Sequence, residues 1–122
     1  MKLGDKIQSA DWKAEKHVPA IDCPDKVQAD TVFTVNVKVG KEIPHPNTVE
    51  HHIRWIELYF QPEGSKFVFQ VGRAEFTAHG EASAFTEPSS QFSMKVNGPG
   101  TLIALELCNI HGLWESFKEI TV

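Results

Sequence analysis

The residues of this 122-residue chain that are best suited to chemistry are a cysteine and several histidines at predicted turns. Residues 108–112 (CNIHG) place a thiol and an imidazole three positions apart, and Gly112 gives the backbone freedom to turn further. If the chain leaves a strand here in a tight turn, Cys108 and His111 converge. The amides of Ile110 and His111 would then point back at the sulfur and stabilise it as a thiolate.

A second group of candidate residues lies in residues 43–52 (IPHPNTVEHH). His45 stands between two prolines, and backbone with so little conformational freedom suits a metal ligand better than a solvated loop histidine. His51 and His52 are neighbours, so in an extended chain their side chains point to opposite faces. We therefore expect only one of them to be a ligand, and the spacing leaves open which one.

A third group lies in residues 15–19 (EKHVP). In extended backbone Glu15 and His17 share a side and Lys16 points away, so a carboxylate can approach whatever His17 binds. Lys16 could join it only if the loop bends or moves. Taken singly, each of these histidines would be an ordinary polar residue, which is our interpretation of His79. Together, four histidines and a cysteine at the ends of elements indicate a site displayed by a rigid scaffold.

The elements that must position these residues are short strands. Residues 4–27, 40–49 and 77–90 are expected to be irregular, and no apolar stripe with helical spacing persists over three turns. Six or seven short strands separated by turns predict an all-β antiparallel sandwich. Alternating apolar residues mark the strands at 31–39, 53–60, 67–71, 92–96, 103–107 (Ile103, Leu105 and Leu107) and 117–122. The tryptophans (Trp12, Trp55 and Trp114) are expected in the core rather than in an electron relay, and Cys23 in a turn.

Composition narrows the classes of function. Hydrophobic residues make up 41% of the chain and charged residues 23%, which predicts one globular domain over residues 1–122. The net charge of −4 without a basic tract argues against a nucleic-acid partner. The apolar runs are too short to span a membrane, and the N-terminus lacks the apolar stretch of a secretory signal, so we expect a cytoplasmic protein. Two cysteines are too few for a disulfide framework, although a single disulfide stays open.

Four segments resemble superoxide reductases of the one-iron neelaredoxin type: residues 15–19, 45–52, 71–81 (VGRAEFTAHGE) and 108–114 (CNIHGLW). The resemblance covers nearly the whole chain. Related desulfoferrodoxins carry an extra N-terminal rubredoxin-like module with four cysteines, whereas this chain has two. The resemblance implies a seven-stranded immunoglobulin-like antiparallel β-sandwich that holds one mononuclear iron (Fe2+/Fe3+) near its surface.

The resemblance also implies a role for each candidate residue. Cys108 would be the axial thiolate ligand of the iron. Glu15 would be a sixth ligand that binds in the ferric state and is displaced in the ferrous state, and Lys16 would be the lysine on the substrate side. The four equatorial imidazoles would be those of His17, His45, His51 and His111, so the resemblance selects His51 over His52. Oxidation adds one positive charge at the metal, and the carboxylate of Glu15 cancels it, so Glu15 should prefer the oxidised metal.

The activity implied is one-electron reduction of superoxide to hydrogen peroxide in oxidative-stress defence. A rubredoxin-like protein would be the electron donor, and the chain would form a homo-oligomer, with a homotetramer favoured. Imidazole and thiolate donors suit iron, and an open sixth position suits chemistry on a small oxygen species.

Three other interpretations predict different properties. A blue-copper electron-transfer protein uses two histidines, a cysteine and usually a weak axial methionine, but no methionine follows His111 and the only internal one is Met94. Structural zinc normally takes four ligands rather than five. A metal-free binding module with the same sandwich would tolerate replacement of His45 or Cys108.

Overall fold

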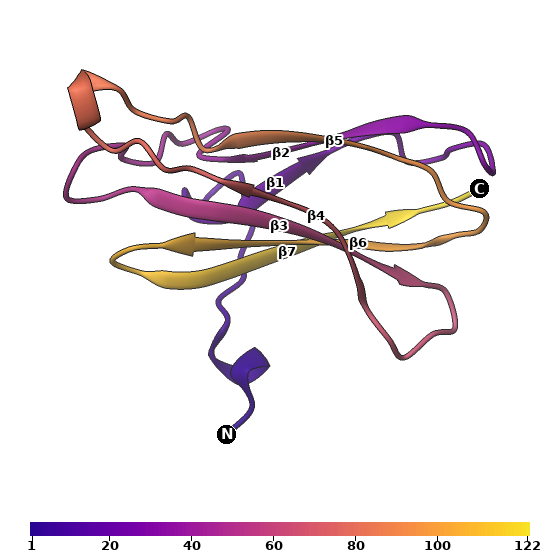
Figure 1. Ribbon diagram of the computed structural model, residues 1–122. Coiled ribbons are helices and arrows are strands. Elements are labelled where there is room, and N and C mark those ends of the chain that lie inside the picture. Colours follow the sequence, from indigo (N-terminus) through magenta and orange to yellow (C-terminus); the bar gives the residue numbers. More distant parts are fainter.

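Two antiparallel sheets build the structure, a computed structural model that describes all residues from 1 to 122. The smaller sheet has the order β1 (Pro19–Asp22), β2 (Phe33–Val39), β5 (Ser89–Met94). The larger sheet has the order β4 (Phe69–Glu75), β3 (Ile53–Pro62), β6 (Gly100–Cys108), β7 (Gly112–Ile120). Figure 1 shows the sheets as two layers. The predicted all-β, seven-stranded antiparallel sandwich is confirmed. The helical elements are two short 3-10 turns, η1 (Leu3–Lys6) and η2 (Glu81–Ser83), and no helix is long and apolar enough to cross a membrane.

The core lies between the sheets and comes from alternate residues of the inner strands. In β2, Val35, Val37 and Val39 are at most 1% exposed, as the alternation of this segment predicts. In β3, Ile56 and Leu58 are completely buried. Each fully buried side chain of this kind stabilises the fold by about 1.5–3 kcal/mol. One continuous apolar cluster therefore joins both sheets.

Strand β6 is confirmed, but the apolar residues that mark it in the sequence do not face the core. Ile103, Leu105 and Leu107 are half-buried on the outer face. The residues that point into the core are the alternate ones, namely Leu102, Ala104, Glu106 and Cys108. Both faces of this strand carry apolar residues, so periodicity alone cannot select the inner one. The choice between the faces places a carboxyl group in the core and Cys108 on the inner face.

Other differences from the sequence expectations concern the ends of elements. Phe67 precedes β4 and is 61% exposed, in the β3–β4 hairpin that points away from the smaller sheet (Figure 1). Strand β1 lies inside a segment expected to be irregular, where four residues pair with β2. Strand β7 begins at Gly112 rather than at 117. None of the three tryptophans belongs to the buried cluster, so their expected place in the core was wrong.

One end of the sandwich, on the left in Figure 1, gathers the segments that carry the candidate residues. Ile53 at the start of β3 pairs with Cys108 at the end of β6, and Cys108 pairs with Gly112 at the start of β7. Pro19 at the start of β1 pairs with Val39 at the end of β2. The chain before β1, the β2–β3 loop and the β6–β7 turn therefore meet at this end.

Candidate metal centre

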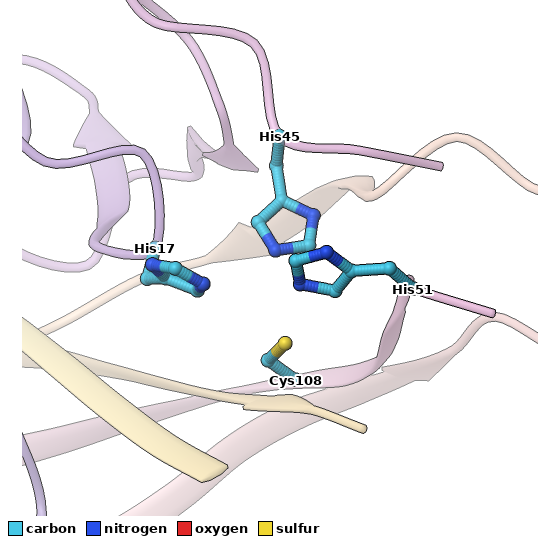
Figure 2. Close-up of side chains that lie close together, drawn as sticks. All are labelled: His17, His45, His51 and Cys108. Carbon is cyan, nitrogen blue, oxygen red and sulfur yellow. The ribbon is translucent and has the colours of Figure 1, made fainter. Parts of the chain in front are cut away.

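Four of the predicted residues bring their ligand atoms to one place. His17 precedes β1, His45 and His51 lie in the β2–β3 loop, and Cys108 ends β6. Their imidazole nitrogens and sulfur all lie within 4.8 Å of one another. Figure 2 shows the sulfur of Cys108 pointing toward the three rings. The neighbouring strands hold these segments in register, so the convergence is a property of the scaffold.

The imidazole of His111 completes a ring of four. Around this ring, neighbouring centroids are 4.9 Å apart for His17–His45, 4.6 Å for His45–His51, 5.0 Å for His51–His111 and 4.7 Å for His111–His17. Across the ring, His17 and His51 are 6.1 Å apart. Four similar sides and a longer diagonal describe a quadrilateral of imidazoles.

The nitrogens of this ring have the spacing of ligands that share an ion. Nε2 of His17 lies 3.0 Å from Nδ1 of His111. Two nitrogens that are each about 2.1 Å from a metal ion, at a right angle, lie about 3.0 Å apart. The sulfur of Cys108 lies 3.7 Å from the same Nδ1 of His111.

Two nitrogens of the ring are buried without a hydrogen-bond partner, Nε2 of His45 and Nε2 of His51. The Nδ1–H of His45 donates to the carbonyl of Pro46 at 2.6 Å, so its Nε2 carries the free lone pair. A buried polar atom without a partner is unfavourable and rare in native proteins. A bound cation would satisfy both lone pairs.

The protonation of the histidines also fits metal binding. Burial lowers the pKa of His45 to about 4, and burial is the main cause that lowers the pKa values of His17 and His51. These imidazoles are therefore neutral at pH 7, and a metal ligand must have its lone pair free. The positive charge of the half-buried Lys16 is a smaller cause that lowers the pKa of His45 and of His51, so its field reaches the ring.

The sulfur of Cys108 is stabilised by the turn that follows it. The residue is 1% exposed, and its Sγ accepts the backbone N–H of His111 at 3.4 Å. Of the two amides expected to point at the sulfur, that of His111 makes this bond. Cys108 and Cys23 are both free, so the disulfide left open by the sequence does not form.

The carboxylate of Glu15 orients His17 and does not join the converging ligand atoms. Its Oε1 accepts the backbone N–H of His17 at 3.1 Å and lies 2.8 Å from Nδ1 of the same residue. These hydrogen bonds lower the pKa of Glu15 and keep it charged. A proton held on Nδ1 leaves Nε2 of His17 free to face the ring, which is the usual arrangement behind a metal-bound histidine.

Comparison with known proteins agrees with this geometry. The model of the family described as desulfoferrodoxin matches residues 9–117. A neelaredoxin from Megalodesulfovibrio gigas is 55% identical over an alignment of 129 positions, which covers 100% of this chain and 99% of the relative. The chain belongs to the desulfoferrodoxin family. A superoxide reductase from Pyrococcus furiosus is 54% identical, with 98% of each chain covered. The solved superoxide reductase (neelaredoxin) from Archaeoglobus fulgidus in the reduced form matches with a TM-score of 0.86 and 51% identity, over 96% of this chain and 99% of that chain.

Two residues beside the centre were not anticipated from the sequence. Trp114 stacks on the imidazole of His17, with centroids 4.8 Å apart and planes at 15°. Its indole N–H donates to the carbonyl of His111 at 3.2 Å, so Trp114 supports two residues of the ring. Asn109 lies between Cys108 and His111 and bonds to the chain on both sides of His51. Its position inside the 108–112 motif is the only sequence signal for it.

His52 lies on the opposite side of the chain from the centre. Its Nδ1 lies 3.0 Å from the carbonyl of Thr48, and its ring stacks on His79 with centroids 3.5 Å apart and planes at 11°. His51 therefore joins the converging atoms and His52 does not, as the alternation of adjacent side chains predicts for one of the two.

Proposed function

We propose that this protein is a superoxide reductase with one mononuclear iron per chain. The iron is held by Cys108 and by the imidazoles of His17, His45, His51 and His111. The observation that carries the proposal is the quadrilateral of imidazoles beside a buried thiol, with two buried nitrogens that lack a partner. The names of the relatives from Pyrococcus furiosus and Archaeoglobus fulgidus support the same activity. Superoxide gains one electron and two protons and becomes hydrogen peroxide.

The donor set fits iron better than the other metals considered. Imidazole with a single thiolate suits iron, whereas structural zinc normally takes four ligands. A blue-copper site would use two of the histidines and a weak axial methionine, but Met94 pairs with Phe33 at the far end of β2 from the centre. Five protein donors leave one position for a small substrate. When bound, ferrous iron supplies the electron that reduces superoxide.

The residues around the ligands prepare this site. The amide of His111 donates to Sγ of Cys108 and stabilises negative charge on the sulfur. The positive charge of Lys16 acts on His45 and His51 and would attract an anionic substrate to the centre. The hydrogen bonds of Glu15 to His17 fix the orientation of that ring. Glu15 also stands two residues from a proposed ligand, so a short movement of the loop would bring its carboxylate to a bound metal, and the positive charge added by oxidation would favour that contact.

We also propose a rubredoxin-like protein as the electron donor. Ile110 is 56% exposed and His111 is exposed at the β6–β7 turn, so a donor can approach the centre closely there. A homo-oligomer, with a homotetramer favoured, is supported by exposed apolar side chains on the outer face of the larger sheet, where Phe117 is 72% exposed and pairs with Ile103. One shared core supports a single domain over residues 1–122. A thiolate that must stay reduced supports the cytoplasm.

The experiment that tests the function compares two cysteine variants. Oxidised wild-type protein should show a visible thiolate-to-iron charge-transfer band and, once reduced, should consume superoxide with formation of hydrogen peroxide. Cys108→Ser should lose the band and most of the activity, whereas Cys23→Ser should keep both. A Cys108→Ser protein that retains band and activity would place the sulfur ligand elsewhere and refute the assignment.

A further inference from the structure

We propose that Asn109 is a positioning residue that clamps the chain around His51 to the turn that carries Cys108 and His111. The clamp sets the distance between the sulfur and the imidazole of His51. This inference rests on the proposed function, because it takes the ligand set from it. Asn109 itself is exposed and contributes no ligand atom.

The clamp consists of hydrogen bonds on both sides of His51. The side-chain Nδ2–H of Asn109 donates to the carbonyl of Glu50 at 3.0 Å, and its Oδ1 accepts the backbone N–H of His52 at 2.8 Å. The backbone N–H of Asn109 donates to the carbonyl of His52 at 3.1 Å. One residue therefore holds the backbone before and after a proposed ligand.

A clamp is needed at this place because the regular sheet ends here. The β3–β6 ladder terminates at the pair of Ile53 and Cys108, and its register shifts between Ile53 and Trp55. His51 precedes the first paired residue of β3, so ladder hydrogen bonds do not fix it. Thr48 holds it from its own loop, through its Oγ1, which accepts the backbone N–H of His51 at 3.0 Å. The hydrogen bonds between residues 50–52 and the turn that carries Cys108 all come from Asn109.

The expected consequence is on metal retention and on the metal–sulfur bond. Loss of a residue that orients ligands typically weakens metal binding by about 10- to 100-fold. Without the two side-chain bonds of Asn109, His51 is held less firmly relative to Cys108, and the energy of the thiolate-to-metal charge transfer changes with the metal–sulfur distance. A residue that only stabilised the fold would not shift this band.

The experiment uses the full chain loaded with cobalt(II), whose thiolate charge-transfer band reports the bond to Cys108 without iron or superoxide. Asn109→Ala removes both side-chain hydrogen bonds. Asn109→Asp keeps an oxygen to accept from His52 and loses the donor to Glu50. The matched control is Gln61→Ala, which removes an amide hydrogen bond to the carbonyl of Ser65, 2.9 Å long, at the opposite end of β3. The measurements are the band position and the rate of cobalt release to excess chelator.

We expect Asn109→Ala to release cobalt roughly 10-fold faster or more and to shift the thiolate band. Asn109→Asp should fall between wild type and Asn109→Ala, and Gln61→Ala should match wild type in both measurements. Unchanged release and an unchanged band in both Asn109 variants would overturn the inference, and so would equal acceleration in Gln61→Ala. A wild-type protein that shows the thiolate band with cobalt but fails to reduce superoxide when loaded with iron would refute the proposed function and leave the clamp intact.

Discussion

The molecule contains two groups of histidines with different arrangements. They meet at adjacent residues, because His51 belongs to the first group and His52 to the second. In the ring of four, nitrogens converge, and Nε2 of His51 has no partner. In the stacked pair of His52 and His79, the planes are within 11° of parallel, so the in-plane lone pairs point side by side and do not converge. The stacked rings also bond to carbonyls through Nδ1 of His52 and Nε2 of His79, although Nδ1 of His79 is buried without a partner, as is Nε2 of His51. Convergence of lone pairs, rather than proximity of rings, therefore distinguishes a metal centre from packing.

A third buried polar group shows why an unsatisfied atom alone does not indicate a metal. Both carboxyl oxygens of Glu106 are buried without a partner, on the inner face of β6 two residues before Cys108. Burial raises the pKa of Glu106 to about 9, so its carboxyl group stays protonated at pH 7. The nitrogens of the ring histidines lie close to other potential ligand atoms, whereas Glu106 belongs to no group of converging ligand atoms.

The largest difference between the two histidine groups should appear in metal content. His51→Ala removes a converging nitrogen, and since loss of a residue that only orients a ligand costs about 10- to 100-fold in affinity, loss of the ligand itself should exceed that range. His52→Ala should keep the metal and lower the stability of the fold. Iron stoichiometry after dialysis against a chelator measures the difference. Iron loss from His52→Ala with retention in His51→Ala would reverse the assignment of the two groups.

The next effect concerns Glu106 and the pH dependence of stability. Its pKa is about 9 in the folded chain and close to 4.5 when unfolded, so unfolding at intermediate pH releases a proton. The free energy of unfolding therefore falls by about 1.4 kcal/mol per pH unit as pH rises through this window. Glu106→Gln removes this slope. The free energy of unfolding of the variant, relative to that of wild type, should therefore rise by roughly 3 kcal/mol from pH 5 to pH 7. Urea unfolding of both metal-free proteins measures it. Parallel pH profiles would show that the carboxyl group is ionised in the fold.

A smaller effect is expected from Lys16, whose charge acts on His45 and His51 of the ring. Superoxide is an anion and the chain has a net charge of −4, so productive encounter needs local positive charge. Charge focused at a site raises association rates by about 10- to 1000-fold, and Lys16→Ala should slow the second-order reaction by roughly 10-fold. It should also flatten the dependence of the rate on ionic strength, with iron content unchanged.

The matched control for Lys16 is Lys66→Ala, which makes the same charge change beside Phe67 in the β3–β4 hairpin. Pulse radiolysis over a series of salt concentrations measures both variants. Equal salt slopes for wild type and Lys16→Ala would refute the steering role.

The smallest effect on activity is expected from Glu15. Glu15→Ala should still reduce superoxide when fully loaded with iron, because the carboxylate orients His17 and, in the proposed function, would block the oxidised site without performing the reduction. Metal affinity should fall by about 10-fold, since the hydrogen bonds to His17 are lost. Glu15→Gln keeps an oxygen acceptor and should recover the affinity. Complete loss of activity with iron retained would assign Glu15 an essential catalytic role.

The sequence alone was sufficient for the fold class and for the candidate residues. Alternation in residues such as Val35 and Val37 predicts the buried strands, because a side chain in a strand points to one face or the other with period two. The prolines on both sides of His45 and the spacing of Cys108 and His111 are local features as well. Such features depend on neighbouring residues in the chain, so they can be recognised without a structure.

Only the tertiary structure decided which atoms meet. Pairing between distant strands decides which face of β6 points inward and, on geometric grounds, that His51 rather than His52 faces the centre. It also brings Asn109 and Trp114 into contact with the segments that carry the ligands. Ile53 and Cys108 are 55 positions apart in the chain and become partners through the β3–β6 register. Sequence patterns record the period of one element, whereas convergence of lone pairs depends on how several elements pack. The physical reason is that a shift of one residue in register reverses every side chain of a strand, and only packing of the whole core selects the register.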